Sequence, residues 1–167
     1  ILLSKKYFYL ISFQHFMAKD SLMAKQIEFI VVSRRIRLLG ITISVGIFVI
    51  YLAGLFVANT NVKENFEIVN ISTLFLLVLI FFITFALKKA MLKKVNLSNF
   101  SNTYFNAHVI PYAVLDFGAL FCLTTNLFVN GNILYATIAL IISLLGMFMN
   151  FPNEDYFENL KEQSNTE

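Results

Sequence analysis

The feature that most constrains this chain is the separation of its charged residues from four apolar runs, each roughly 20 residues long. The runs are residues 38–58, 69–87, 109–129 and 133–151, with charged or polar blocks between them. A helix of about 20 apolar residues can cross roughly 30 Å of hydrocarbon. The chain is therefore predicted to be all-α and integral to a membrane, with four transmembrane helices in an antiparallel bundle.

The composition agrees with a membrane protein and divides the chain into three parts. Hydrophobic residues make up 58% of it and charged residues 14%, whereas soluble domains carry about 25% charged residues. We expect a cytoplasmic N-terminal segment over residues 1–37, the transmembrane bundle over 38–151, and an acidic cytoplasmic tail over 152–167. The tail is expected to be disordered beyond Leu160.

The N-terminal segment leaves two questions open. Isoleucines and valines recur at helical spacing over residues 17–37, which fits either a short interfacial helix or an ordinary polar lead-in. Because the sequence opens with Ile1, we also consider Met17 and Met23 as alternative start residues, in which case the residues before them would be untranslated.

Lysine and arginine are distributed unevenly between the ends of the runs. The segment before the first run contains Lys19, Lys25, Arg34, Arg35 and Arg37, and the loop after the second contains Lys88, Lys89, Lys93 and Lys94. The loop after the first run has only Lys63, and the turn after the third has none. The positive-inside rule then places both termini on the cytoplasmic side of a bacterial inner (plasma) membrane. It also accounts for the net charge of +3, so nucleic acid is not expected as a partner.

The third and fourth runs are predicted to form a tight hairpin. Only Asn130, Gly131 and Asn132 separate them, and Asn-Gly is a strong turn signal. At the start of the third helix, Ser98 or Ser101 is a candidate N-cap. Pro111 lies either in the first turn of that helix or inside it, where it would kink the helix.

Small residues recur along both helices of the hairpin. One stripe is Gly118, Cys122 and Thr125, and the other is Ala136, Ala139, Ser143 and Gly146. Small residues let membrane helices approach closely, so these two faces are predicted to meet in the tightest helix contact of the bundle. Residues 74–83 of the second run are bulky and apolar on all sides, which favours a lipid-facing position.

Asp116 is the one acidic residue inside the four apolar runs. A carboxylate in a transmembrane helix costs about 2.5–3.5 kcal/mol on insertion scales, so something in the folded protein should compensate for it. Tyr112, one turn earlier, shares its face and is a candidate hydrogen-bond partner. Asp116 and Tyr112 are therefore the candidate proton or cation site. The other interpretation is a protonated or water-bridged Asp116 that fixes helix packing.

Two resemblances follow from these residues. The stretch from Leu115 to Phe121 resembles the carboxylate-bearing helix of rotary ATP synthase subunit c, with an acid, a small residue two positions on and then an apolar run. The other helix of that two-helix subunit has closely spaced glycines, which no run here has. The chain as a whole is similar to uncharacterised small four-helix bacterial membrane proteins, a likeness that implies no known activity.

Other chemistry is not indicated. Cys122 is the single cysteine, and His15 and His108 lie far apart, so neither a metal site nor a cofactor is predicted. His108 is interpreted as an interfacial residue, and Asn70 and Asn126 as helix caps. We expect a non-enzymatic accessory or structural subunit that acts by helix association in the lipid bilayer, as a homo-oligomer or in a larger membrane complex. The alternative is a small proton- or cation-coupled translocator that uses Asp116.

Overall fold

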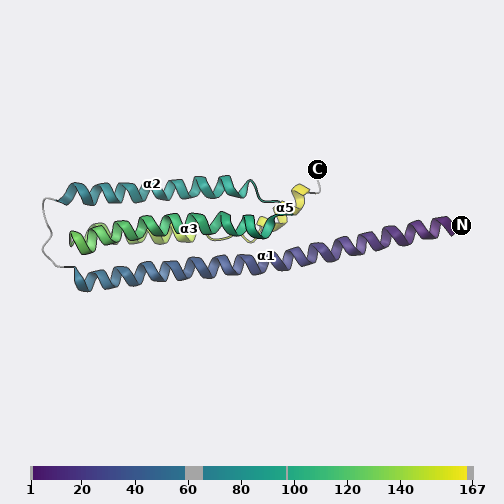
Figure 1. Cartoon of the computed structure of the whole chain (residues 1–167), viewed down its shortest axis with the longest axis horizontal. Helices are drawn as coiled ribbons and strands as arrows, with labels where there is room; N and C mark the ends of the chain where they lie inside the picture. Colours follow the sequence, from purple (N-terminus) through teal and green to yellow (C-terminus); the bar gives the residue numbers. More distant parts are fainter. Residues whose placement is uncertain (1, 59–65, 97, 165–167) are drawn as a thin grey trace.

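The structure, a computed structural model, describes residues 2–58, 66–96 and 98–164, with side chains for residues 23–58, 66–96 and 98–162. These residues form helices and no strand, which confirms the all-α class. The elements are α1 (Leu2–Val57), α2 (Glu67–Leu92), α3 (Phe100–Thr124), the π-helix η2 (Thr125–Val129), α4 (Ile133–Met149) and α5 (Tyr156–Ser164). In Figure 1 the long helices lie side by side, and the first turns of α1 extend beyond the others.

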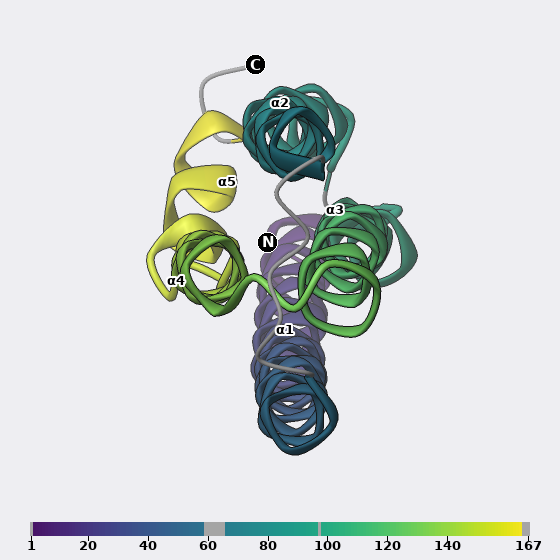
Figure 2. The same ribbon diagram turned by 90° about the vertical axis from the view of Figure 1, so that its left-hand side faces the viewer.

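The four long helices form one bundle. Seen end-on in Figure 2, α1 and α2 lie at opposite corners, with α3 and α4 between them. Gly40 of α1 faces the ring of Tyr112, and Gly54, further along α1, faces Leu127 of η2. Residue numbers rise in the same direction along the two helices from one contact to the next, so α1 and α3 run parallel, as the first and third helices of an up-and-down bundle do.

The N-terminal segment does not form a separate helix before the first apolar run. Residues 17–37 continue without a break into residues 38–57 as part of α1. They contain no glycine or proline and many good helix formers, so nothing in the sequence interrupts the hydrogen-bond ladder. Figure 1 shows this segment extending along the line of the bundle rather than turning across its end.

The helix α3 begins at Phe100, earlier than the expected start near residue 109. Its N-cap is Asn99, whose side chain makes no capping hydrogen bond, so neither Ser98 nor Ser101 caps this helix. The preceding turn is ordered instead by Asn96, whose Oδ1 accepts hydrogen bonds from the backbone N–H groups of Ser98 and Asn99 at 3.2 and 2.9 Å. Asparagine side chains commonly stabilise turns in this way.

Pro111 lies in the interior of α3 rather than in its first turn, which decides between the two positions left open by the sequence. The residue is buried. Proline has no backbone N–H, so α3 lacks one hydrogen bond to the carbonyl of Ala107 at this point.

An aromatic cluster explains the early start of α3 and the order of the tail. The ring of Phe29, on α1, lies 5.4 Å from Phe100, 5.6 Å from Tyr104 and 5.4 Å from Phe157 of α5. Phe157 and Leu160 are buried, so α5 packs against the bundle through its apolar face. The expectation of disorder beyond Leu160 was wrong as far as Ser164, where the described residues end.

The helix α2 is not lipid-facing on all sides. Leu77 is fully buried, and Ile80 packs where a Cβ on Gly118 of α3 would lie. Phe75 and Phe82 are exposed on the other side of the helix. An all-apolar sequence has no polar face to show which side a neighbour covers, and in the folded chain α3 is that neighbour.

The turn between η2 and α4 forms the predicted hairpin. Gly131 has a φ of 64°, in the left-handed region that favours glycine. The side chain of Asn132 accepts a hydrogen bond from the backbone N–H of Tyr135, which caps α4.

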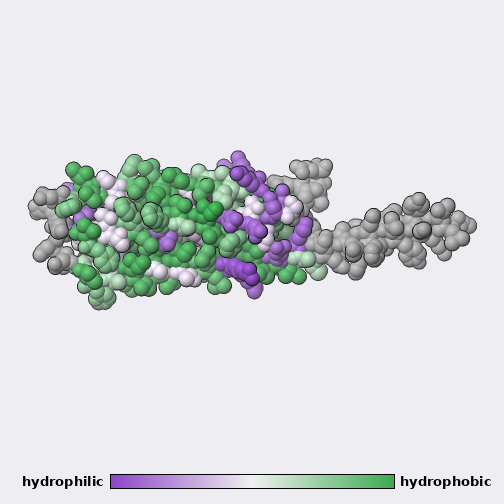
Figure 3. Space-filling view, in the orientation of Figure 1, coloured by the Kyte–Doolittle hydropathy of each residue, from purple (hydrophilic) through white to green (hydrophobic). Residues whose placement is uncertain are grey.

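The surface shows a wide apolar band and a polar end. Figure 3 shows hydrophobic residues over most of the visible face and hydrophilic ones gathered at the end nearest the N-terminal extension. Three helices, over Met23–Val57, Glu67–Leu92 and Phe100–Val129, are long and apolar enough to cross a membrane. The fourth, α4, is also apolar but shorter, at 17 residues.

Candidate functional site

Asp116 is half-buried on α3, one turn after Tyr112. Tyr112, which shares its face on the helical wheel, contacts α1 at Gly40. It therefore lies on the flank of α3 that faces α1, and its neighbour Phe117 is exposed. Among the described residues nothing forms a hydrogen bond or an ion pair with its carboxyl group. The described part of the chain therefore leaves the acid without a partner.

Tyr112 does not pair with Asp116. Its ring packs edge-on against Phe151 at 6.5 Å, and its hydroxyl points towards Gly40, where a Cβ would lie 2.8 Å from the oxygen. The residue is fully buried, and the hydroxyl has no hydrogen-bond partner within the described part of the chain. The structure thus separates the two members of the candidate proton or cation site. The tyrosine faces the α1 backbone, while the acid lies at the edge of the interface.

The small residues of α3 face α2 rather than α4. A Cβ on Gly118 would lie 2.8 Å from Ile80 on α2. Cys122 is fully buried, and its Sγ accepts a hydrogen bond from the Asn126 amide at 3.4 Å. Thr125 is only half-buried, and its hydroxyl bonds to a carbonyl of its own helix. Gly118 and Cys122 of this stripe are buried, and Gly118 meets α2 instead of α4.

The small residues of α4 line its buried face. Ala136, Ala139 and Ser143 are fully buried, and the Ser143 hydroxyl donates to the Ala139 carbonyl at 2.7 Å. Gly146 accommodates Leu115 of α3, since a Cβ there would lie 2.5 Å from its Cδ2. At Gly146 the stripe of α4 therefore meets a large side chain of α3, and Phe81 of α2 lies beside it.

A buried polar cluster, formed by Asn70, Thr73, Cys122, Asn126 and Asn130, lies between α2 and the end of α3. The Asn130 amide donates to Asn70 Oδ1 at 2.5 Å, and the Asn126 amide donates to Thr73 Oγ1 at 3.2 Å. Both contacts cross to α2. Asn70 and Asn126 are therefore interhelical hydrogen-bonding residues, and their interpretation as helix caps was wrong.

The π-helix η2 positions the two asparagines of this cluster. The wider turn of η2 is closed by a bond of 3.1 Å from the Asn130 N–H to the Thr125 carbonyl. Positions 126 and 130 are four residues apart and lie on the same side of the helix, and both side chains are buried, at 0% and 1% exposure. Their Oδ1 atoms have no partner within the described part of the chain. The cluster thus retains acceptor capacity for a donor such as water.

Sequence reasoning missed this cluster, although a signal for it was present. The two asparagines near the end of the third run are four residues apart, and Asn70 lies near the start of the second run, which is at the same level in an antiparallel bundle. Asparagine hydrogen-bonds across helices in membranes. Three asparagines at one level therefore indicate an interhelical contact rather than independent caps.

Two charged contacts hold the opposite end of the bundle. The Lys88 ammonium of α2 donates to the carbonyls of Met149 and Phe151, at 3.5 and 3.2 Å, where α4 ends. A cation at a helix C-terminus is favourable because the last carbonyls lack partners within the helix. Arg37 of α1 forms an ion pair of 2.8 Å with Glu154, just before α5.

His108 is buried inside the bundle. It is 1% exposed and lies two turns inside α3, where its ring contacts that of Tyr104 at a centroid distance of 4.5 Å. Its Nδ1 lies 3.0 Å from the Tyr104 carbonyl, an acceptor, which requires the proton on Nδ1. The early start of α3 moves this residue from the expected helix boundary into the core.

Comparison with protein-family models, with curated proteins and with solved structures gave no match. Within residues 2–58, 66–96 and 98–164, no three histidine, cysteine or acidic side chains lie together as a metal site would require. Within these described residues, the candidate site consists of one carboxyl group without a partner and one buried amide cluster.

Proposed function

We propose that this chain is a polytopic membrane protein that acts by association with other membrane helices, either those of a second copy or those of a larger complex. Asp116 carries the proposal. It is half-buried beside an exposed Phe117, with no partner in the described part of its own chain. Hydrocarbon offers no hydrogen-bond partner, so a polar group from a neighbouring helix would compensate it.

We further propose that the chain spans a bacterial inner membrane four times, with both termini on its cytoplasmic side. The apolar helix α4 returns beside α3, which supports a fourth span although α4 is shorter than the other three. Basic residues of α1 and of the end of α2 lie at the same end of the bundle, where Figure 3 shows the hydrophilic surface. The positive-inside rule assigns that end to the cytoplasm.

The alternative is a small proton- or cation-coupled translocator that uses Asp116. The observation in its favour is the same uncompensated carboxyl group, about 10 Å into the membrane if the cytoplasmic boundary lies near residue 109. It is the weaker proposal because Tyr112 points away from the acid and no described ionisable side chain forms an ion pair with it. Neither proposal assigns the chain an enzymatic activity or a cofactor.

The association proposal can be tested with three variants of the full chain in mild detergent or lipid nanodiscs. Asp116→Leu removes the hydrogen-bonding group and should convert the wild-type oligomer, or its complex, into the isolated chain. Asp116→Asn keeps the size and most of the hydrogen bonding, and should leave the assembly intact. Thr124→Val is the matched control, since that exposed hydroxyl already bonds to carbonyls of its own helix. Mass photometry and native mass spectrometry measure the assembly.

The outcomes separate the two proposals. A wild-type chain that is monomeric and co-purifies with no stable partner, or an Asp116→Leu variant that assembles like the wild type, contradicts association through this residue. Loss of function in Asp116→Asn with the fold and assembly preserved, together with carbodiimide labelling of the wild-type acid, favours translocation instead. A wild-type phenotype for Asp116→Asn with no labelling ends the translocator alternative.

A further inference from the structure

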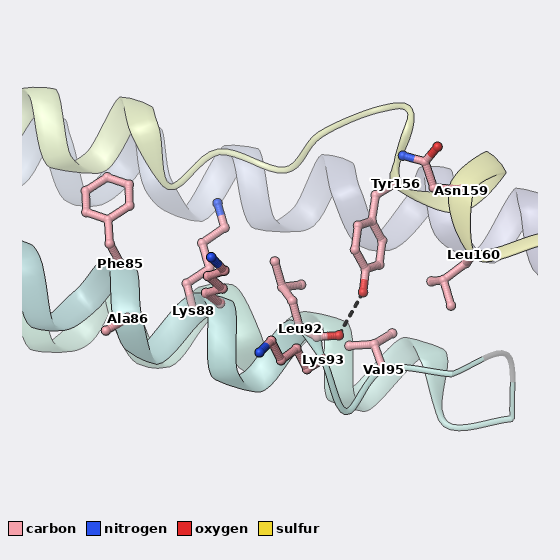
Figure 4. Close-up of a pocket in the computed structure, with 10 residues that line it drawn as sticks. Phe85, Ala86, Lys88, Leu92, Lys93, Val95, Tyr156, Asn159 and Leu160 are labelled. Atoms are coloured by element: carbon pink, nitrogen blue, oxygen red, sulfur yellow. Dashed lines mark hydrogen bonds between the residues drawn. The ribbon is translucent and has the colours of Figure 1, made fainter. Parts of the chain in front are cut away.

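A groove of about 780 Å³ lies between the end of α2 and the tail helix α5. Figure 4 shows Tyr156 reaching across it to α2, with Lys88 pointing from α2 towards the segment that follows α4. The Tyr156 hydroxyl donates to the Leu92 carbonyl at 2.9 Å, and the Lys88 ammonium donates to the Phe151 carbonyl at 3.2 Å. These two hydrogen bonds fix both walls, so the groove is built by tertiary packing.

The polar lining of this α2–α5 groove is cationic. It contains the ammonium groups of Lys88, Lys89 and Lys93, and the side chain of Asn159. None of the described lining residues is acidic, and neither Lys89 nor Lys93 has an ion-pair partner in the described part of the chain. Lysine ammonium groups and amide N–H groups are donors for phosphate oxygens.

The rest of the lining is apolar and runs towards the membrane-spanning part of α2. Phe85 and Ala86 lie before the lysines on α2, whereas Val95 and Leu160 close the other end. A soluble phosphate has no apolar part to pack against such a surface, whereas the glycerol and first acyl carbons of a phospholipid would cover it. Basic pockets between membrane helices at the cytoplasmic side are suited to anionic lipid headgroups.

We propose that the α2–α5 groove binds the phosphate of an anionic phospholipid, with Lys89 and Lys93 as its main cationic contacts and the acyl chain beside Phe85. Lys88 orients the groove wall by holding the end of α4, and the Asn159 amide supplies a neutral donor. This inference rests on the proposed membrane location of the lysine-bearing end. It does not depend on the association through Asp116.

The test uses the full chain in uncharged detergent at low salt, with thermal unfolding followed as lipid is added. Dioleoylphosphatidylglycerol should raise the unfolding midpoint more than dioleoylphosphatidylcholine does. The double variant Lys89→Gln/Lys93→Gln should weaken the apparent affinity for phosphatidylglycerol about 30-fold, because each lysine near an anionic headgroup accounts for about a five-fold change. The control Arg35→Gln/Lys94→Gln removes the same charge from exposed positions outside the groove and should keep the wild-type affinity.

Three results would overturn the inference. Equal stabilisation by the two lipids would show that the headgroup charge is not recognised. Equal weakening by the two double variants would assign the effect to the general charge of this end. Equal stabilisation by glycerol 1-phosphate alone would show that the site takes a soluble phosphate compound rather than a lipid.

Two further variants keep these outcomes interpretable. If the double lysine variant does not fold, Asn159→Asp replaces it, since this exposed position tolerates the change and the new carboxylate repels the phosphate. Asp116→Leu should keep the preference for phosphatidylglycerol even where it loses assembly. A failure of the association proposal and a failure of the lipid site are thereby read from different variants.

Discussion

The hydrogen bond between Asn70 and Asn130 gives the sharpest quantitative prediction. The two side chains are each 1% exposed, and the Asn130 amide donates to Asn70 Oδ1 at 2.5 Å. The Asn130 Oδ1 has no partner among the described residues, so the bond to Asn70 is what satisfies this side chain within the described part of the chain. Replacing Asn70 with alanine would leave the Asn130 side chain buried without a partner.

The magnitude follows from this geometry. Leaving a buried polar group unpaired costs about 1–3 kcal/mol, so Asn70→Ala and Asn130→Ala should each destabilise the protein by that amount. Interhelical hydrogen bonds in a membrane protein couple by about 0.6 kcal/mol on average and about 1.7 kcal/mol at most. The two changes together should therefore cost less than the sum of the single changes by an amount within that range.

The assay is a double-mutant cycle of unfolding free energies, measured by denaturing the full chain in mixed micelles. The control cycle pairs Asn70→Ala with Ser143→Ala, because the Ser143 hydroxyl bonds within α4 to the carbonyl of Ala139. That second cycle should be additive within about 0.3–0.5 kcal/mol.

A coupling of the asparagine pair no larger than that of the control cycle would refute the reasoning. It would mean that each amide finds an equivalent partner when the other is removed. An Asn70→Ala variant more stable than the wild type would refute it more directly, since the contact would then have no net favourable free energy.

Three further predictions concern topology, packing and pH. Reporter fusions at Lys94 should report the cytoplasm and fusions at Gly131 the opposite side, and an external Lys94 would contradict the positive-inside assignment. Gly118→Leu should lower the unfolding midpoint in detergent far more than Gly46→Leu, since a Cβ on Gly118 meets Ile80 at 2.8 Å whereas nothing lies within 4 Å of one on Gly46; equal tolerance would contradict the packing. Burial raises the pKa of Tyr156 in the folded protein above its usual value near 10. The neutral hydroxyl therefore adds to the free energy of unfolding below about pH 10, and this contribution is lost as the pH rises further. Unfolding midpoints measured against pH should therefore fall more steeply for the wild type than for Tyr156→Phe, and parallel curves would count against this.

The sequence predicted the helices and the hairpin well because both depend on local patterns. Long apolar runs form helices wherever backbone groups must pair internally. The turn at Gly131 requires the left-handed conformation that glycine adopts without steric cost. Such signals lie within a few residues of the feature they determine.

The boundaries that depend on distant residues were not predicted. The third helix was expected to start near residue 109, but Phe100 and Tyr104 pack against Phe29, and Phe100 also packs against Phe157, near the other end of the chain. The free energy of that burial outweighs the weak helix propensity of asparagine and serine. No local sequence pattern around Phe100 indicates that these distant residues are its partners.

The candidate site was predicted in part for a similar reason. The charge and position of Asp116 identify it as unusual, and helical spacing correctly places Tyr112 one turn away. The spacing does not determine which neighbour each side chain meets. Tyr112 turns towards α1 because Gly40 leaves room for its ring, and the room exists only where the two helices cross.

The aromatic contact between α1 and α5 can form only late in the synthesis of the chain. Phe29 belongs to α1, which is synthesised before the other described helices, and its partner Phe157 belongs to α5, which is synthesised after the four long ones. The apolar face of α1 around Phe29 is therefore left without that cover while the helices between are made and inserted, at about 5–20 residues per second. Phe100 and Tyr104 of α3 can cover part of Phe29 before then, and we expect a nascent chain halted before Phe157 to leave the rest of that aromatic surface exposed.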